Sequence, residues 1–251
     1  MYRAKNRYPK PGIPCPRRES LCGFEIMSKT KLIVALDTPD LKTAGVLLRQ
    51  LKGLPVIYKV GSGLFTLAGP RAVDLVHKHG GKVFLDLKFY DIPNTVRSAV
   101  ESAARLGVYS VSLHLSGGTE MLEAAAGLNK RPLLWGITVL TSFDERSFAG
   151  TGFKNSMEET IYSLAASGAA HGADGIVCSP REAAALKARC GAGLKVITPG
   201  IRIESGGDDQ KRTMTPAGAA AAGADFIVVG RPVLKARDPA AAVRDILEVL
   251  K

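Results

Sequence analysis

The chain has 251 residues, of which 46% are hydrophobic and 23% charged, and its formal net charge at pH 7 is +11. This length can bury a full hydrophobic core without disulfides or metals, and a single α/β barrel takes about 250 residues. Charged residues interrupt every apolar stretch before it reaches the roughly 18 residues that a membrane span needs. The composition therefore excludes membrane-spanning, collagen-like and wholly disordered chains, and we expect no membrane partner.

The first part of the chain differs from the rest. Residues 1–26 contain four prolines, six basic and two acidic side chains, without helical or strand periodicity. We interpret residues 1–28 as a basic, disordered N-terminal extension and residues 29–251 as one folded domain. A true basic arm and translation from Met27 are both open. The segment lacks the apolar core of a secretory signal, and the four cysteines show no metal-ligand spacing, so we expect a cytoplasmic protein.

Short apolar runs alternate with helical stretches from Lys31 onward. Such near-continuous runs are typical of parallel strands covered on both faces. They occupy residues 32–37, 56–61, 82–88, 108–114, 133–140, 174–179, 194–200 and 225–230. Eight strand–helix units predict a (β/α)8 TIM barrel, with a doubly wound open sheet as the alternative because periodicity cannot prove closure. Helix boundaries are indicated at Pro70, Gly80, Pro93, Leu106–Gly107, Ser156 with Glu159, and Thr215–Pro216.

Polar residues gather where these strands end, which is where barrels carry their catalytic groups. The ends hold Asp37, Lys59, Asp86 with Lys88, His114, residues 138–142, Ser179, Arg202 and Gly230–Arg231. The amino ends of the strands are plainer. This asymmetry predicts an active site at the carboxyl end of the barrel.

The densest cluster is DLKFYDIPNT, residues 86–95. Asp86 and Lys88 are two apart on a strand, so their side chains share a face. With Asp37, Lys59 and Asp91 they can form an alternating array of carboxylates and ammonium groups. A purely structural ion-pair network is one alternative, and a Mg²⁺ site on the three carboxylates is another, although the interleaved lysines already supply the cation. A Schiff-base lysine is a third, disfavoured because flanking carboxylates keep an amine protonated.

A second cluster is typical of phosphate binding. The seventh strand ends in TPGIR (198–202) and the eighth in VVGRP (228–232). The loops after strands seven and eight form the usual phosphate site of a barrel, where glycine amides and an arginine meet the dianion. Gly230 allows close backbone approach and Arg231 supplies paired donors. A surface ion pair is the alternative role for Arg231.

Motifs from Lys31 to the C-terminus together resemble the orotidine 5′-phosphate decarboxylase family, in its bacterial form. They are ALD (35–37), YKVG (58–61), DLKFYDIPNTV (86–96), GITVLTS (136–142), TPGIR (198–202), DQKR (209–212) and VGRPV (229–233). The DxKxxD pattern alone is shared with sugar-phosphate decarboxylases and hexulose-phosphate synthase. The continuation into DIPNT and the TS pair favour the orotidylate branch.

The resemblance implies decarboxylation of orotidine 5′-monophosphate to UMP, the last step of de novo pyrimidine synthesis, without cofactor or metal. It implies a homodimer with shared active sites. By carry-over, Lys88 is the proton donor to C6, within an array of Asp37, Lys59, Asp86 and Asp91. Further substrate contacts are implied for Ile92, Thr95, Thr141, Ser142, Pro199, Arg202, Gln210, Gly230 and Arg231, with Asp91, Ile92 and Thr95 reaching the partner subunit's site.

A rival hypothesis from another class uses the net charge of +11 and the basic extension to bind nucleic acid. It predicts steeply salt-dependent binding that is lost on truncation before Met27. The sequence contains no motif that reads DNA or RNA, so we expect no nucleic-acid partner.

Overall fold

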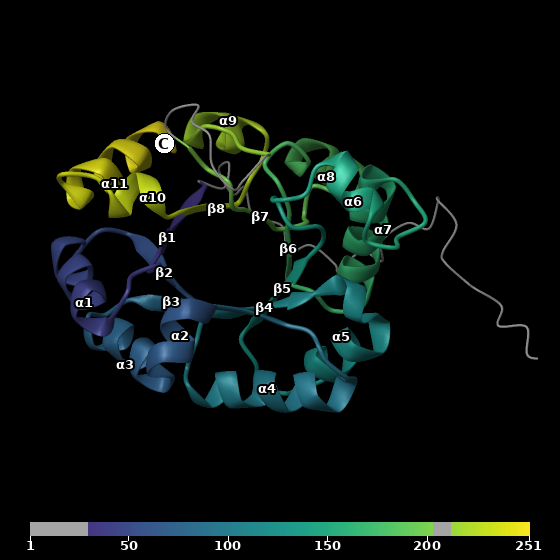
Figure 1. The fold of residues 1–251 in the computed structure, drawn as a ribbon, viewed down its shortest axis with the longest axis horizontal. Helices are drawn as coiled ribbons and strands as arrows, with labels where there is room; N and C mark the ends of the chain where they lie inside the picture. The colour runs from purple at the N-terminus through teal and green to yellow at the C-terminus, as the bar shows by residue number, and fades with distance from the viewer. Residues whose placement is uncertain (1–29, 203–211) are drawn as a thin grey trace, which may run out of the picture.

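The computed structural model describes residues 30–202 and 212–251. Its eight parallel strands close into a barrel in which each strand pairs with the next along the chain and β8 pairs with β1 (Figure 1). The strands are β1 (Lys31–Ala35), β2 (Val56–Gly61), β3 (Lys82–Phe89), β4 (Ser110–His114), β5 (Leu133–Ile137), β6 (Gly175–Val177), β7 (Val196–Thr198) and β8 (Phe226–Val229). The predicted TIM barrel is confirmed, and the open-sheet alternative is wrong. The predicted extension, residues 1–28, lies outside the described residues.

Helices surround the barrel on its outer side (Figure 1). Those described are α1 (Leu41–Gln50), α2 (Ser62–Ala68), α3 (Pro70–Lys78), α4 (Pro93–Arg105), η1 (Leu115–Gly117), α5 (Thr119–Ala126), α6 (Glu145–Ala149), α7 (Met157–Ala170), α8 (Ala183–Cys190), α9 (Pro216–Ala221), α10 (Arg231–Leu234) and α11 (Pro239–Val249). The capping box that begins α7 and the proline starts of α3, α4 and α9 are as the sequence predicts. Local capping signals therefore set these boundaries.

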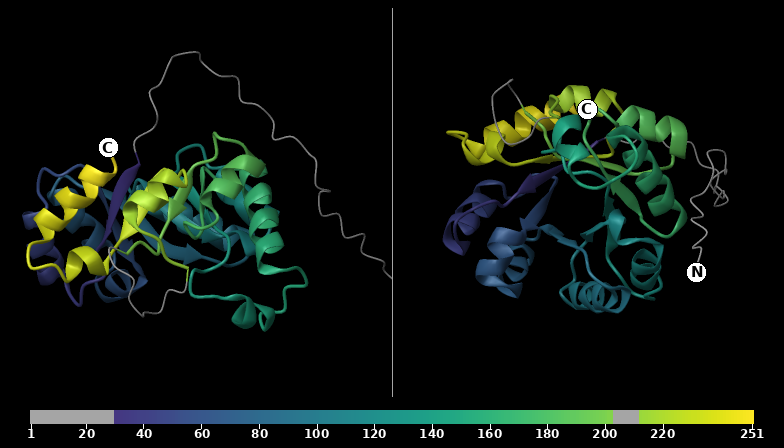
Figure 2. Two further views of the ribbon diagram at one scale, coloured as in Figure 1. Left: turned by 90° about the horizontal axis from the view of Figure 1, so that it is seen from above. Right: turned by 45° about the vertical axis from the view of Figure 1, so that its right-hand side comes forward.

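The strand predicted over residues 133–140 is shorter than expected. β5 ends at Ile137, because the chain then turns into a loop whose Thr141 and Ser142 line a cavity. The loop leads to α6, which lies beyond the carboxyl ends of the strands in Figure 2 (left). The last residues of an apolar run can thus line a cavity and not extend the strand.

Two apolar clusters hold the fold together. The larger lies between the strands and the surrounding helices. The smaller fills the barrel and centres on Trp135, whose ring lies 4.4 Å from that of Phe84 and 5.1 Å from that of Phe226, measured between centroids. Trp135 is 1% exposed and so fills the interior of the barrel. Tilted aromatic pairs at these separations add to the stabilisation from burial.

Two acidic residues tie strands together at the amino end of the barrel. Asp174, just before β6, accepts a hydrogen bond from Leu134 N at 2.8 Å and pairs with Arg131. Asp225, just before β8, accepts one from Val196 N at 2.9 Å and pairs with Lys187 at 2.7 Å and Lys195 at 3.1 Å. We call Asp174 and Asp225 the acidic clamps. Each joins its strand to a neighbouring one.

We expect Asp225→Asn to lower the free energy of unfolding by roughly 1.5–3 kcal/mol, because charge-assisted hydrogen bonds to a buried carboxylate are lost. Burial raises the pKa of Asp225, but its bonds with Lys187 and Val196 outweigh burial and leave the pKa below its ordinary value. At pH values above the ordinary pKa of an aspartate, the ionised Asp225 carboxylate therefore stabilises the fold. This stabilisation is lost as the pH falls through the lowered pKa of the folded state. Urea unfolding at neutral and acidic pH measures this. An equal difference between parent and variant at both pH values would contradict it.

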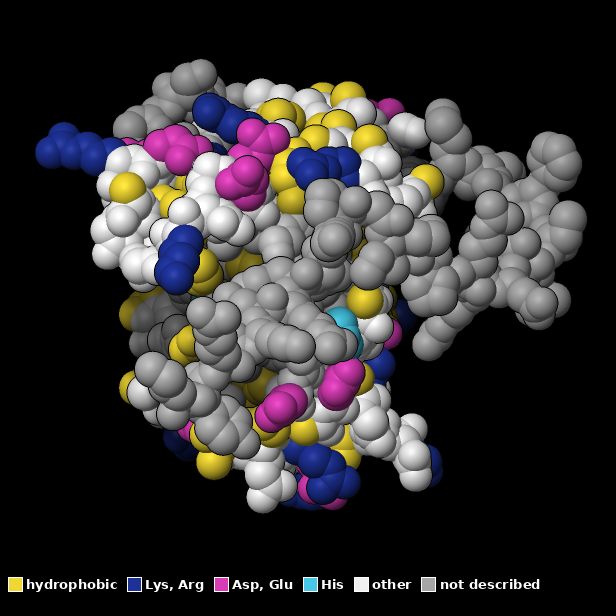
Figure 3. Space-filling view, turned by 90° about the vertical axis from the view of Figure 1, so that its right-hand side faces the viewer, with side chains coloured by type: hydrophobic (Ala, Val, Ile, Leu, Met, Phe, Trp, Pro, Cys, Tyr) yellow, Lys and Arg dark blue, Asp and Glu magenta, His cyan; other side chains and the backbone are white. Residues whose placement is uncertain are grey.

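None of the helices in residues 30–202 and 212–251 has both the length and the apolar character that a membrane span requires. On the face in Figure 3, over the helices at the right of Figure 1, cationic and anionic side chains are interspersed.

Candidate active site

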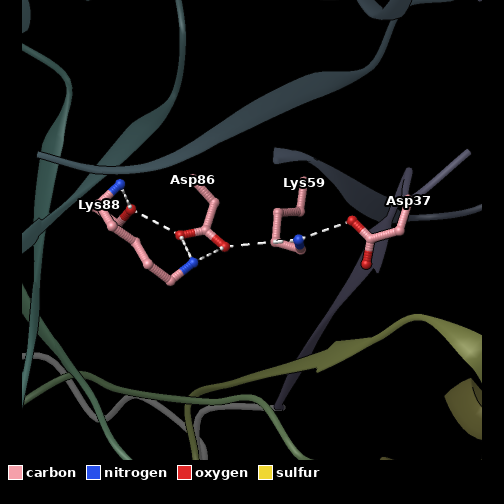
Figure 4. A network of polar contacts seen from close by, with 5 residues as sticks. Asp37, Lys59, Asp86 and Lys88 are labelled. Atoms are coloured by element: carbon pink, nitrogen blue, oxygen red, sulfur yellow. Dashed lines mark hydrogen bonds and ion pairs between the residues drawn. The ribbon is translucent and has the colours of Figure 1, made fainter. Parts of the chain in front are cut away.

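Four side chains of alternating charge lie in a row at the carboxyl ends of β1, β2 and β3 (Figure 4). Lys88 Nζ lies 2.9 Å from both carboxylate oxygens of Asp86. The other neighbour of Asp86 is Lys59, at 3.6 Å from Nζ to Oδ2, and Lys59 Nζ also lies 3.0 Å from Asp37 Oδ1. The predicted array of Asp37, Lys59, Asp86 and Lys88 is thus brought together.

Asp86 is the buried centre of this row. Its side chain is 11% exposed, whereas that of Lys88 is 41% exposed. Burial raises the pKa of the Asp86 carboxyl, but the charges of Lys59 and Lys88, with hydrogen bonds from Lys88 and Ser112, outweigh burial and leave the pKa below its ordinary value. A permanent buried carboxylate therefore faces the more open ammonium of Lys88.

A glycine makes room for the second ammonium. Gly61 pairs in register with Asp86, and a Cβ on Gly61 would lie 3.1 Å from Lys59 Nζ and 3.4 Å from Asp37 Oδ1. Any side chain there would crowd the ion pair between Lys59 and Asp37. The glycine of the YKVG motif thus has a steric role that sequence reasoning did not assign.

The backbone at Lys88 departs from a regular strand. Lys88 has a φ of 54°, in the left-handed region that side chains other than glycine rarely adopt. The β3–β4 ladder shifts register between Leu85 and Phe89. Lys88 N donates a hydrogen bond of 2.9 Å to Ser112 Oγ, which itself donates one of 2.7 Å to Asp86 Oδ1. The simple alternation expected for residues 86 and 88 is therefore replaced by a bulge.

A cavity of about 710 Å³ opens beside the array. Of the predicted site residues, its wall includes Asp37, Lys59, Asp86, Lys88, Thr141, Ser142, Pro199, Arg202, Gly230 and Arg231. Apolar side chains from several strands, among them Phe84 of β3 and Ile137 of β5, complete the wall. The cavity is within the size range of small-molecule sites, with charged groups set among apolar lining residues.

The loops after β7 and β8 supply the arginines of the cavity. Gly200 has a φ of 82°, which glycine adopts without strain, and Arg202 N donates to Met214 O at 3.0 Å. These contacts position Arg202 at the wall that it shares with Gly230 and Arg231. Gln210, the remaining residue predicted for this end, lies outside the described residues.

Three predicted residues are not brought to this cavity. Asp91, Ile92 and Thr95 are exposed at the start of α4 and do not line its wall. Asp91 Oδ1 accepts a hydrogen bond of 2.7 Å from Ile92 N, and the Ile92 side chain is 67% exposed. Within one chain, the array therefore consists of four residues and not five.

The other polar groups near the array are less suited to a direct role in a reaction. His114, at the end of β4, packs edge-on against Tyr90 with ring centroids 5.7 Å apart. Burial, together with the nearby Lys88 charge, lowers the pKa of His114 and so favours the neutral ring. In the described part of the chain, no group of three or more His, Cys, Asp or Glu side chains is arranged to hold a metal ion. Lys59 separates the carboxylates of Asp37 and Asp86.

The family described as "Orotidine 5'-phosphate decarboxylase / HUMPS family" matches residues 30–246. The chain belongs to this family. The predicted resemblance is thereby confirmed over the whole barrel.

Individual members of the orotidine 5′-phosphate decarboxylase family agree with this assignment. The orotidine 5′-phosphate decarboxylase of Nitratidesulfovibrio vulgaris (strain DP4) is 50% identical over 227 residues, covering 86% of this chain and 96% of that protein. The one from Trichlorobacter lovleyi is 44% identical over 229 residues, covering 88% and 95%. The crystal structure of the Lactobacillus acidophilus decarboxylase has a TM-score of 0.79 at 34% identity, covering 88% of this chain and 99% of that one.

Sequence reasoning missed several residues of this family member's site. The clearest of them is Ser112. It is a polar residue in an otherwise apolar strand, and it lies two positions before His114, so both side chains face the same side of the strand. That periodicity could have indicated it. The contact of Lys88 with Ser112 depends on a bulge, for which the sequence gives no comparable signal.

Proposed function

We propose that this chain decarboxylates orotidine 5′-monophosphate to UMP and CO2, the last step of de novo pyrimidine synthesis. The single observation that carries the proposal is the alternating row of Lys88, Asp86, Lys59 and Asp37 on the wall of a cavity that also holds Arg202 and Arg231. A substrate with a carboxylate at one end and a phosphate at the other matches these two groups of charges. Family membership gives the reaction class.

The chemistry requires electrostatic stabilisation. Loss of CO2 from C6 leaves an electron pair in the plane of the pyrimidine ring, so the π system cannot delocalise it. An ammonium fixed near C6 is attracted more strongly as negative charge develops there, which lowers the barrier by binding the transition state better than the substrate. Lys88 Nζ is the partly exposed ammonium at the cavity wall, and it then transfers a proton to C6.

Asp86 contributes in a second way. Its carboxylate stays ionised beside Lys88, so a substrate carboxylate bound next to it is repelled. At a separation of about 4 Å and an effective dielectric constant near 20, that repulsion is on the order of 4 kcal/mol. Enzymes lower barriers by roughly 8–23 kcal/mol, so repulsion alone is insufficient. Asp86 therefore acts together with the ammonium that it positions.

Lining residues from the loops after β5, β7 and β8 hold the rest of the nucleotide. Arg231, Gly230 and Arg202, with Gln210, bind the phosphate, while Thr141 and Ser142 contact the pyrimidine and Pro199 contributes to the wall. Binding energy from a phosphate remote from C6 fixes the base against the array and so contributes to kcat as well as to affinity. This division of roles accounts for both the array and the arginines on the wall of one cavity.

The experiment is a spectrophotometric assay. Purified protein is added to orotidine 5′-monophosphate in buffer with EDTA, and the fall in absorbance of the substrate is followed. We expect turnover to persist in EDTA, since the array uses ammonium groups as its cations. Folded protein that gives no absorbance change contradicts the proposal, and strict dependence on added Mg²⁺ would support the sugar-phosphate branch of the family instead.

We further propose a homodimer in which Asp91, Ile92 and Thr95 complete the partner subunit's site. The support is their exposure next to the array-bearing strand β3, together with their absence from the cavity of their own chain. Tyr90 and Ile92 present apolar surface at the same place, as interface residues do.

A cytoplasmic location stays a prediction from the cysteine content.

Mixing two inactive variants tests the shared sites. We expect Lys88→Ala and Asp91→Ala each to lose activity, and a mixture that exchanges subunits to regain part of it, because one site of each hybrid then carries both native residues. The measurement is specific activity after co-incubation, compared with each variant alone. Full inactivity of a mixture shown to contain hybrids would contradict the proposal.

A further inference from the structure

We propose that Ser112 is a positioning residue for this reaction: its hydroxyl joins the backbone of Lys88 to the carboxylate of Asp86 and so fixes the direction of the Lys88 ammonium. This inference rests on the proposed function and extends it to a residue outside the charged row. Ser112 lies on β4 and is fully buried. It contacts Asp86 and Lys88 but is not among the residues that line the cavity.

The direction of both hydrogen bonds follows from the donors. A backbone N–H can only donate, so the Ser112 hydroxyl accepts the bond of 2.9 Å from Lys88 N. Its own proton is then directed to Asp86 Oδ1, at 2.7 Å. One hydroxyl therefore uses its acceptor on one residue of the array and its donor on another.

The backbone of Lys88 needs such an anchor. Its φ of 54° lies in a region that is sparsely populated for residues with side chains, and such conformations persist only where the surroundings fix them. The ladder pairs Leu85 with Val111 and Phe89 with Leu113, so β3 holds more residues than β4 between these pairs. Within this bulge, the Lys88 N–H is bonded to the Ser112 side chain.

The bulge determines where the amine lies. From this bent backbone the Lys88 side chain returns to Asp86 and places Nζ 2.9 Å from both of its oxygens. Removal of the hydroxyl would take this partner from the partly buried Lys88 N–H and from one buried Asp86 oxygen, and both ends of the Lys88–Asp86 pair would be free to shift. Displacing a catalytic group by about 1 Å can lower a rate on the order of 10²-fold.

The test compares two serines of one strand. Ser110 lies two residues before Ser112 on β4, is also fully buried, and its hydroxyl has no hydrogen-bond partner among the described residues. Ser110→Ala is therefore a matched control that removes the same atom from the same strand. We expect Ser112→Ala to lower kcat on the order of 10²-fold and Ser110→Ala to leave it unchanged. Ser112→Cys, a weaker donor and acceptor of similar shape, should be intermediate, and it carries the comparison if Ser112→Ala does not fold.

A pH profile separates positioning from general stability. The groups facing Asp86 are Lys59 from β2, Lys88 from β3 and His114 from β4, with Asp37 beyond Lys59. The Ser112 hydrogen bond is one of the interactions that lower the pKa of Asp86. In Ser112→Ala the acidic limb of kcat/KM should therefore move to higher pH, whereas in Ser110→Ala it should not move.

Amide hydrogen exchange gives a readout that does not depend on activity. The Lys88 amide should exchange faster in Ser112→Ala than in the parent and in Ser110→Ala. A parent enzyme that fails to turn over orotidine 5′-monophosphate would sink the proposed function, while this exchange comparison would still test the anchor. Parent-like kcat in Ser112→Ala, or equal losses in both serine variants, would overturn the positioning role.

Discussion

Lys88→Ala is expected to abolish decarboxylation while the chain still binds the product nucleotide. The substitution removes both the cation that opposes the developing charge at C6 and the proton donor, and the loss in kcat should be at least about 10⁴-fold. Asp86 loses the partner that contacts both its oxygens, but Lys59 remains 3.6 Å away to compensate its charge. The fold should therefore survive.

Two measurements check this expectation. Single-turnover assays give the rate of the chemical step, and calorimetric titration with UMP gives affinity. Lys78→Ala, which removes an exposed lysine of α3 that does not line the cavity, controls for the loss of one positive charge. Turnover within tenfold of the parent would remove Lys88 from the mechanism, and loss of UMP binding in parallel with activity would show that it serves ground-state binding.

Arg231→Ala should weaken the enzyme through the phosphate end of the cavity. Arg231 lines the same cavity as Lys88 but belongs to α10, after β8, where barrels bind phosphate. Removal of one charged partner from a hydrogen-bonded ion pair costs about 2–5 kcal/mol, so kcat/KM for orotidine 5′-monophosphate should fall roughly 30- to 4,000-fold.

The discriminating substrate for Arg231 is orotidine, which has no phosphate. Its kcat/KM should be the same in the parent and in Arg231→Ala, because the lost contact is absent from both reactions. Arg237→Ala provides the control, since Arg237 is exposed and is not part of the cavity wall. A loss for orotidine as large as the loss for the phosphorylated substrate would show that Arg231 maintains the cavity and does not bind phosphate.

The barrel and most of its charged row could be predicted from the sequence. Parallel strands must end at the same edge of a barrel, so Asp37, Lys59 and Asp86 had to lie close together once the strands were placed. Their contacts follow from chain order and charge alone. The motifs after the seventh and eighth strands placed Arg202 and Arg231 on the cavity in the same way.

Other parts of the site could not be predicted, for physical reasons. The left-handed backbone at Lys88 depends on a register shift between two strands, which periodicity within one strand does not encode. Ser112 gains its role only through that shift. The fit of Gly61 to the Lys59 ammonium depends on the positions of the Lys59 and Asp37 side chains, which come from two other places in the chain. The role of Asp91, Ile92 and Thr95 in a partner subunit's site stays a prediction, because the structure contains one chain.

The acidic clamps have a consequence for engineering and for sequence drift. They precede β6 and β8, at the rim opposite to the charged row. Substitutions that are far apart and share no partners usually have additive effects. A designer can therefore reinforce the rim around Asp174 and Asp225 for heat tolerance with little risk to turnover, and a lineage can change one rim without compensating changes at the other.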